Sequence, residues 1–221
     1  QVFSNIVTGT KPILVLLPGT MGSNLEQADD LIWIKYGKFL AGKLTKLKIN
    51  AQNVNASSLV RTSYKKMIDH FASTYDVVTF PYDWRVDLEA SAKIFDSTIK
   101  GLLKYNQPIK IIAHSMGGVL VRDFIINHPA TWQALNSSTG FKMAFLGVPL
   151  GGSFRIASVL FGQDSIINKL AKIDLFHTKK ELLEMFSAFP GLHNLLPLTT
   201  DPENDFSKPE TWFKMRDALG D

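Results

Sequence analysis

The chain of 221 residues contains no cysteine. This absence excludes disulfide bonds, thiolate metal sites and a cysteine nucleophile. No apolar run reaches the roughly 18 residues that a membrane-spanning helix needs. The numbering opens on Gln1 without the charged-then-apolar pattern of a signal peptide. Hydrophobic residues make up 45% of the chain, which is enough for one sizeable core. We therefore expect a globular protein, soluble or peripheral to a membrane, in a compartment that the sequence does not name.

Acidic residues are scarce between positions 31 and 70, where eight Lys or Arg accompany a single acid, Asp69. A basic stretch can attract an anionic lipid surface, or it can simply be a solvated face, and both interpretations stay open. No helix or motif that reads nucleic acid accompanies the charge, so we expect no nucleic-acid partner.

Short apolar runs alternate with helix-like segments along the chain. The runs Ile13–Leu17, Asp76–Phe80, Ile109–Ala113 and Lys142–Leu146 are typical of strands buried on both faces of a parallel sheet. Apolar residues at helical spacing within 88–105 and 116–127 predict helices between successive strands. Strands joined by helices predict an α/β fold, with a mostly parallel sheet and flanking helices.

Residues 154–189 again carry apolar residues at helical spacing, after the fourth predicted strand. We expect one or two helices there that form part of a cap or lid, although an ordinary crossover helix fits the pattern equally well.

The strongest catalytic signal is Ala113-His114-Ser115-Met116-Gly117-Gly118, at the junction between a predicted strand and a predicted helix. This pattern is typical of a nucleophile elbow, with Ala113 in place of the first glycine. A tight strand-to-helix turn needs small residues two before and two after the serine. It lifts the Ser115 hydroxyl above the sheet and leaves the backbone N–H of Met116 at the helix N-terminus, where it can stabilise an oxyanion.

A second element, Pro18-Gly19-Thr20-Met21-Gly22-Ser23, directly follows the first predicted strand. In this architecture the loop after that strand supplies the other N–H of the oxyanion hole, and Thr20 is the best candidate. A plain Pro-Gly turn would be the preferred interpretation if the elbow were absent.

Five segments in order resemble motifs of the lecithin–cholesterol acyltransferase family, which includes lysosomal phospholipase A2: 17–26, 80–85, 113–118, 147–153 and 189–197. The resemblance implies an α/β-hydrolase fold, a serine nucleophile at Ser115, a mobile lid and no cofactor or metal. It further implies hydrolysis or transfer of the acyl groups of phospholipid or neutral-lipid esters. Some family members carry a disulfide-bonded loop near Trp33, which this chain cannot form.

By the same resemblance, Trp33, Tyr36 and Phe39 look like a loop that contacts substrate or membrane, and the neighbouring lysines suit such an interface. Packing of these aromatic side chains against the core is an equally good interpretation. We expect Asp83, Trp84 and Arg85 to be structural, with a buried Asp–Arg pair beside the tryptophan.

A serine hydrolase also needs a general base and an orienting acid, which in this fold follow the serine along the chain. His177 and His193 are weak candidates for the base, and Asp164 and Asp174 for the acid, because none follows a recognisable strand. No convincing strand appears after Leu146. We therefore expect residues 1–221 to form a single but incomplete α/β-hydrolase domain. Its His and Asp would come from beyond residue 221 or from a second polypeptide that completes the sheet.

The sequence thus predicts a lipid esterase, phospholipase or acyltransferase that works through an acyl-enzyme at Ser115. This chain alone would then lack activity. Two alternatives remain open: a catalytically silent module that binds lipid or protein, and an esterase that acts on small soluble esters.

Overall fold

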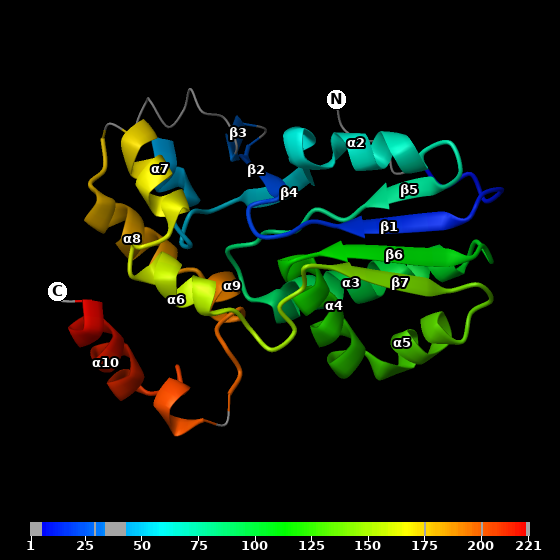
Figure 1. Ribbon diagram of the computed structural model, residues 1–221. Helices are drawn as coiled ribbons and strands as arrows, with labels where there is room; N and C mark the ends of the chain where they lie inside the picture. The colour runs from blue at the N-terminus through cyan, green and yellow to red at the C-terminus, as the bar shows by residue number, and fades with distance from the viewer. Residues whose placement is uncertain (1–5, 29, 34–42, 175, 200, 220–221) are drawn as a thin grey trace.

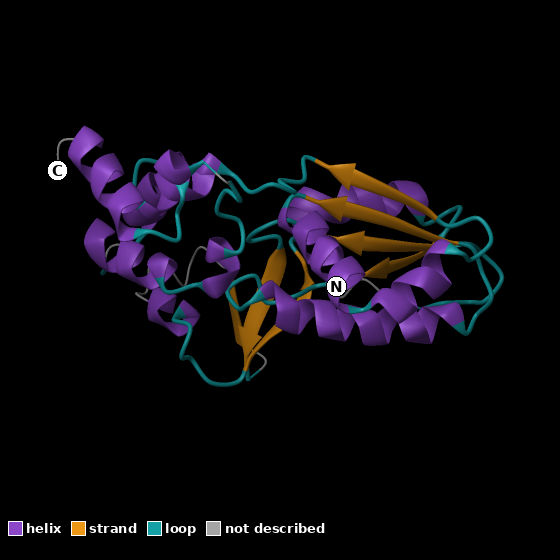
Figure 2. Ribbon diagram, turned by 90° about the horizontal axis from the view of Figure 1, so that it is seen from below, coloured by secondary structure: helices purple, strands orange, loops and turns teal. Residues whose placement is uncertain are grey.

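The structure is a computed structural model that describes residues 6–28, 30–33, 43–174, 176–199 and 201–219. A four-stranded parallel sheet in the order β5-β1-β6-β7 carries helices on both faces (Figures 1 and 2). Its strands lie close to the four predicted runs: β1 (Ile13–Leu17), β5 (Asp76–Thr79), β6 (Ile109–His114) and β7 (Lys142–Leu146). The predicted α/β fold, with a mostly parallel sheet flanked by helices, is confirmed.

The central strand β1 is buried on both faces because every one of its five residues is apolar. Ile13, Val15 and Leu17 join the larger core cluster, whereas Leu14 and Leu16 join a smaller one. Successive side chains of a strand point to opposite faces, so the continuous apolar run requires helices on both sides.

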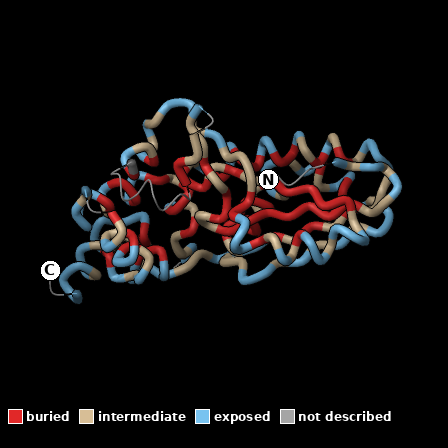
Figure 3. Tube along the Cα trace, turned by 90° about the horizontal axis from the view of Figure 1, so that it is seen from above, coloured by how far each residue is buried: buried red, intermediate tan, exposed pale blue. Residues whose placement is uncertain are grey.

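The two faces of the sheet are covered by different helices. On one face α2 (Arg61–Phe71) contributes Tyr64 and Ile68 to the smaller cluster. On the other face, α3 (Leu88–Leu103) and α4 (Met116–Asn127) pack together, with α5 (Pro129–Asn136) beside them. Figure 3 shows the buried strands running between helices whose outer sides are exposed. This arrangement holds the carboxyl ends of β1 and β6 side by side.

Strand β7 is an edge of the sheet within the described residues. It pairs with β6 along one side, and Lys142, Ala144 and Leu146 are exposed. In β6, by contrast, Ile109, Ile111 and Ala113 are buried. An edge strand with exposed backbone groups can accept another strand.

Residues 20–60 carry no clean period, and the sequence analysis assigned them no element. They form an antiparallel sheet in the order β3-β2-β4 with a short 3-10 helix. The elements are β2 (Ser23–Gln27), β3 (Asp30–Trp33), η1 (Lys43–Leu47) and β4 (Val54–Leu59). The pattern was missed because both strand pairs contain register shifts, which break the alternation of apolar and polar residues.

Residues 154–189, called the cap segment below because a cap was one of the two interpretations of the sequence, contain three helices, which corrects the expectation of one or two. They are α6 (Phe154–Leu160), α7 (Ser165–Ile173) and α8 (Lys179–Ser187). The Asp164 side chain accepts from the N–H of Ile166 and starts α7, and Thr178 forms a capping box with Glu181 at the start of α8. These two helix N-caps mark helix starts that the apolar periodicity of the segment does not reveal.

Short elements follow the cap: α9 (Pro190–His193), η2 (Pro202–Asn204) and α10 (Pro209–Leu219). The sequence analysis did not predict α10. It lies at the far side of the cap from the parallel sheet (Figure 1). Its Trp212 contacts the rings of Phe206 and Phe161, which attach α10 to the cap. No helix in the described part of the chain is long and apolar enough to cross a membrane.

Candidate active site

Ser115 lies at the sharp turn where β6 ends and α4 begins. Its backbone has φ 50° and ψ −121°, a conformation that non-glycine residues rarely adopt. Such a conformation costs of order 1–3 kcal/mol and persists only where the surroundings enforce it. Here the Ser115 N–H donates to the carbonyl of Leu146 at 2.9 Å, and its carbonyl accepts from the N–H of Gly118. The turn therefore has the geometry expected of a nucleophile elbow.

The small residues around Ser115 permit this turn. Ala113 is fully buried in β6. A Cβ atom added to Gly117 would lie 2.6 Å from the carbonyl oxygen of Pro18 and 2.9 Å from the Cβ of Leu17. Only glycine therefore lets α4 approach the end of β1 so closely, and this approach brings the loop after β1 next to Ser115.

The predicted oxyanion residues lie together. A Cβ added to Gly19 would be 3.0 Å from the Cβ of Ser115, so the loop after β1 rests directly on the elbow. The Thr20 hydroxyl donates to the sulfur of Met116 at 3.3 Å. Met116 is the first residue of α4, where backbone N–H groups lack partners within the helix. Thr20 and Met116, 96 positions apart in sequence, thus flank Ser115.

Three aromatic side chains hold this loop, and the sequence analysis did not assign that role to any of them. The Tyr64 hydroxyl accepts from the N–H of Gly19 at 2.8 Å. The Tyr82 hydroxyl donates to the carbonyl of Pro18 at 2.8 Å, and the Trp33 indole donates to the carbonyl of Met21 at 2.9 Å. No local pattern signals these contacts, because each joins residues from different elements.

A pocket of about 830 Å³ opens in front of Ser115. The loop after β1, α2 and the elbow form one side, and α6 and α7 of the cap form the other. The cap side is largely apolar and includes Ile156, Val159 and Leu170, while Arg155 and Lys169 are its charged members. An apolar wall of this kind can hold an acyl chain beside the serine.

Trp33, the first of the three aromatic residues expected to contact substrate or membrane, is the last residue of β3. Trp33 is 2% exposed and its ring makes an edge contact with Trp84, with centroids 5.3 Å apart. The structure packs Trp33 in the core cluster, and the same residue lines the pocket in front of Ser115, so its contact with substrate stays a prediction. Tyr36 and Phe39 lie outside the described residues.

The expected Asp–Arg pair is present. The Arg85 guanidinium donates to both carboxylate oxygens of Asp83, at 2.9 and 2.6 Å, and is 2% exposed. It also donates to the carbonyls of Leu47 and Lys48. Arg85 therefore joins the chain after β5 to η1, and it does not reach the pocket in front of Ser115.

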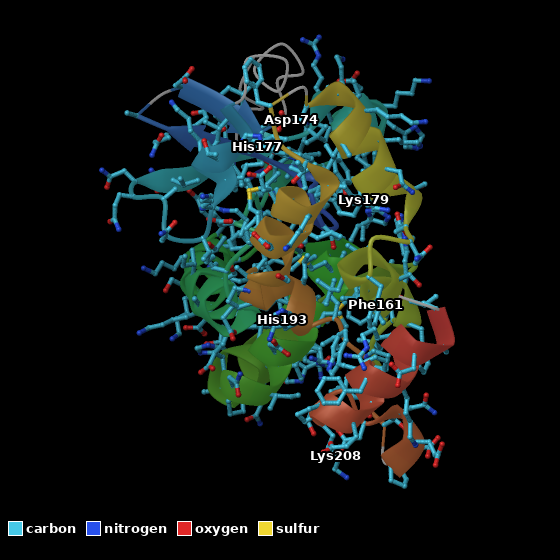
Figure 4. The ribbon with its side chains drawn as sticks, turned by 90° about the vertical axis from the view of Figure 1, so that its left-hand side faces the viewer. Phe161, Asp174, His177, Lys179, His193 and Lys208 are labelled. Atoms are coloured by element: carbon cyan, nitrogen blue, oxygen red, sulfur yellow. The ribbon has the colours of Figure 1, made fainter. Side chains whose placement is uncertain are left out.

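The histidines proposed as weak bases lie away from Ser115. His177 Nδ1 lies 2.6 Å from an oxygen of Asp174, whose carboxylate is fully buried. His177 lines a separate groove of about 440 Å³ between η1 and α8, and Asp174 is not among the residues that line it. Figure 4 shows Asp174 and His177 together and His193 apart from them, at the end of α9. Among the described residues that line the Ser115 pocket, His114 is the one histidine.

The two acidic candidates have local partners. Asp164 pairs with Arg155 at 2.7 Å and caps α7, and the hydrogen bond from Arg155 holds the pKa of that carboxyl below its ordinary value. Asp174 accepts from the N–H groups of Phe176 and His177 as well as from the imidazole. Neither acid lines the Ser115 pocket. The described residues include no cluster of three or more side chains suited to a metal ion.

A parallel sheet with this strand order, a turn with the geometry of a nucleophile elbow after β6 and an adjoining loop after β1 are features of the α/β-hydrolase fold. The sequence matches the model of the lecithin:cholesterol acyltransferase family over residues 41–217, and the chain belongs to that family. It is 30% identical over 90 residues to phosphatidylcholine-sterol acyltransferase of Mus musculus. That match covers 38% of this chain and 20% of the mouse protein.

Among solved structures, the chain is similar to a Bacillus licheniformis lipase in its mature form. The TM-score is 0.42 at 13% identity, and the match covers 83% of this chain and 62% of the lipase. The chain thus spans less than two thirds of the length of either protein.

Proposed function

We propose that this chain carries the nucleophile and the oxyanion hole of a serine-dependent hydrolase or acyltransferase that acts on phospholipid or neutral-lipid esters. The observation that carries the proposal is the strained turn at Ser115, at the mouth of a pocket with an apolar wall. Natural proteins keep such strain mainly at functional sites.

In the proposed reaction the Ser115 hydroxyl oxygen attacks the ester carbonyl and passes its proton to a general base. The backbone N–H groups of Thr20 and Met116 hold the oxyanion of the tetrahedral intermediate. The ester C–O bond then breaks, the leaving alcohol takes the proton, and the acyl group remains on Ser115. Water or an acceptor alcohol attacks the acyl-enzyme in the second half-reaction and restores the serine.

We propose that the base and the acid are a His and an Asp supplied from beyond residue 221 or by a second polypeptide. His177 and Asp174 are geometrically a His–Asp pair, but His177 lines the groove at η1 and neither residue lines the Ser115 pocket. The exposed edge of β7 supports a completed sheet, because further strands could pair there.

The helices at 154–189 are proposed as the lid. Their apolar residues form one wall of the Ser115 pocket, so movement of α6 and α7 would open or close it. The basic stretch before Asp69 and the loop with Tyr36 and Phe39 are proposed to contact a lipid surface.

The test is intact-mass spectrometry of the natural protein after exposure to a fluorophosphonate probe. One adduct that disappears in Ser115→Ala and persists in Ser153→Ala, a second serine in the pocket lining, supports the proposal. Labelling of a 24.6 kDa species without a partner would place the base within these residues. Absence of labelling in every form of the folded protein would refute the proposal and favour a lipid-binding module without catalysis.

A further inference from the structure

Tyr64 lies between the loop after β1 and the turn at Ser115, the two segments that form the candidate site. It belongs to α2, and its side chain is 5% exposed as a residue of the smaller core cluster. Its hydroxyl nevertheless reaches the oxyanion loop, where it accepts from the Gly19 N–H at 2.8 Å. The same hydroxyl lies 2.9 Å from Nδ1 of His114, the residue before Ser115. One oxygen atom thus touches both the loop and the elbow.

The loop is shaped to admit this hydroxyl. A Cβ added to Gly22 would lie 2.9 Å from the Tyr64 oxygen and 2.8 Å from the carbonyl oxygen of Gly19. A Cβ added to Gly19 would lie 3.0 Å from His114 Nδ1. The two glycines therefore leave the space through which Tyr64, the loop and His114 make contact.

The Tyr64 hydroxyl accepts from Gly19 and has one hydrogen to donate. Among its described contacts, Nδ1 of His114 is the acceptor within reach, so we assign the hydrogen to it. In that arrangement Nδ1 carries no proton and the imidazole proton is on Nε2. Burial lowers the pKa of His114 and favours this neutral form, and burial raises the pKa of Tyr64, which keeps its hydrogen.

The charged groups that share the pocket with His114 do not favour its protonation. From the cap, Arg155 on α6 and Lys169 on α7 line the same pocket, and both are basic. From α2 the neighbour is Tyr64 itself, and from the loop it is the backbone of Gly19. No carboxylate lines this pocket among the described residues, so nothing there would stabilise a charged imidazole.

We propose that Tyr64 is a positioning residue that locks the oxyanion loop onto the nucleophile elbow through neutral His114. The role rests on the proposed function, because it matters for catalysis only if Thr20 and Met116 hold an oxyanion above Ser115. Without the hydroxyl, the Gly19 N–H and His114 Nδ1 lose their shared partner. The loop is then still held at Pro18 and Met21 but no longer at Gly19, the residue next to Thr20.

Tyr64→Phe removes the hydroxyl and retains the ring, which contacts His114 edge-on with centroids 6.0 Å apart. We expect the maximal rate of Ser115 labelling by a fluorophosphonate to fall about 10- to 100-fold, the scale seen when reacting groups are misplaced by about 1 Å. The half-saturating probe concentration should stay within about twofold of the wild type, because the oxyanion contact forms only in the transition state. Tyr105→Phe, at a tyrosine that is 46% exposed, is the matched control and should label like the wild type.

A second measurement does not depend on catalysis. In the natural protein labelled with ¹⁵N-histidine, NMR should show His114 as the Nε2–H tautomer, with its signals assigned by their loss in His114→Gln. In Tyr64→Phe the tautomer should become mixed and the pKa of His114 should rise, because Nδ1 of the neutral form has lost its donor. A merely structural tyrosine would change thermal stability without changing the tautomer.

The outcomes separate this inference from the proposed function. A wild type that does not label refutes the proposed function itself. If the wild type labels and Tyr64→Phe labels at a rate within about twofold of it, only the role of Tyr64 is refuted. An unchanged His114 tautomer in Tyr64→Phe also refutes that role. A slower variant with a mixed tautomer and an unchanged half-saturating concentration supports it.

Discussion

Gly117→Ala should destabilise the protein, although alanine is the better helix former. Gly117 is the second residue of α4, and a Cβ there would meet the carbonyl oxygen of Pro18 at 2.6 Å and the Cβ of Leu17 at 2.9 Å. Both contacts are shorter than real Cβ atoms tolerate, and both partners belong to the end of the central strand β1 or the residue after it. A flexible side chain could move away, but this backbone is held on both sides by neighbouring strands.

The expected change in the free energy of unfolding is the difference between two opposing effects. Overpacking against an immobile backbone costs about 3 kcal/mol, the upper part of the usual range. Replacing glycine by alanine inside a helix returns about 1 kcal/mol. The free energy of unfolding should therefore fall by about 2 kcal/mol, which lowers the melting temperature of a chain this size by about 4–8 °C.

Gly101→Ala is the matched control. Gly101 lies in the last turn of α3, and an added Cβ would meet nothing within 4 Å. The same substitution should therefore stabilise the protein by up to about 1 kcal/mol. Thermal unfolding followed by circular dichroism would measure both variants. A Gly117→Ala protein that melts at or above the wild-type temperature would refute the close-approach argument.

Three further predictions concern single side chains. Arg85→Met should lower the free energy of unfolding, measured in urea, by about 3–5 kcal/mol, because it leaves the Asp83 carboxylate without its partner. A loss under about 1 kcal/mol would contradict a buried pair. Phe95→Ala should lower the free energy of unfolding by about 3–5 kcal/mol, since Phe95 is fully buried. No change would contradict this prediction and mean that the core closes around the cavity. Asp164→Asn should lower the melting temperature at pH 6. Because Arg155 lowers the folded-state pKa of Asp164, the difference from wild type should shrink as pH falls below about 4, and a constant difference would exclude the ion pair as its cause.

Several parts of the fold were predictable because their signals are local. The apolar run at 13–17 coincides with β1, since an unbroken apolar run of five can be buried as a strand of a covered sheet. The segment at 142–146 coincides with β7, but it opens on Lys142 and three of its five residues are exposed, so the expected burial on both faces is wrong for this edge strand. The elbow was predictable because a strand-to-helix turn around a serine demands small residues at fixed positions, here Ala113 and Gly117.

Other parts were not predictable from local patterns. The sheet of β2, β3 and β4 was missed because SNLEQ is mostly polar, half of VNASSL is polar, and register shifts interrupt their pairing. The helix N-caps at Asp164 and Thr178 divide residues 154–189 into more helices than the periodicity of the segment indicated. Trp33 carried two equal interpretations, and only its burial beside Trp84 distinguishes core packing from exposure.

The sequence by itself determined the class of fold, the family and the candidate nucleophile, because strand burial and the elbow depend on residues that are neighbours along the chain. Only the tertiary structure decided which distant groups meet at Ser115. Tyr64 and His114 are 50 positions apart, and Thr20 and Met116 are 96 apart, yet each pair is in contact. The physical reason is the parallel sheet, which sets the ends of β1 and β6 side by side and lets α2 reach over them, whereas His177 stays with Asp174 at η1.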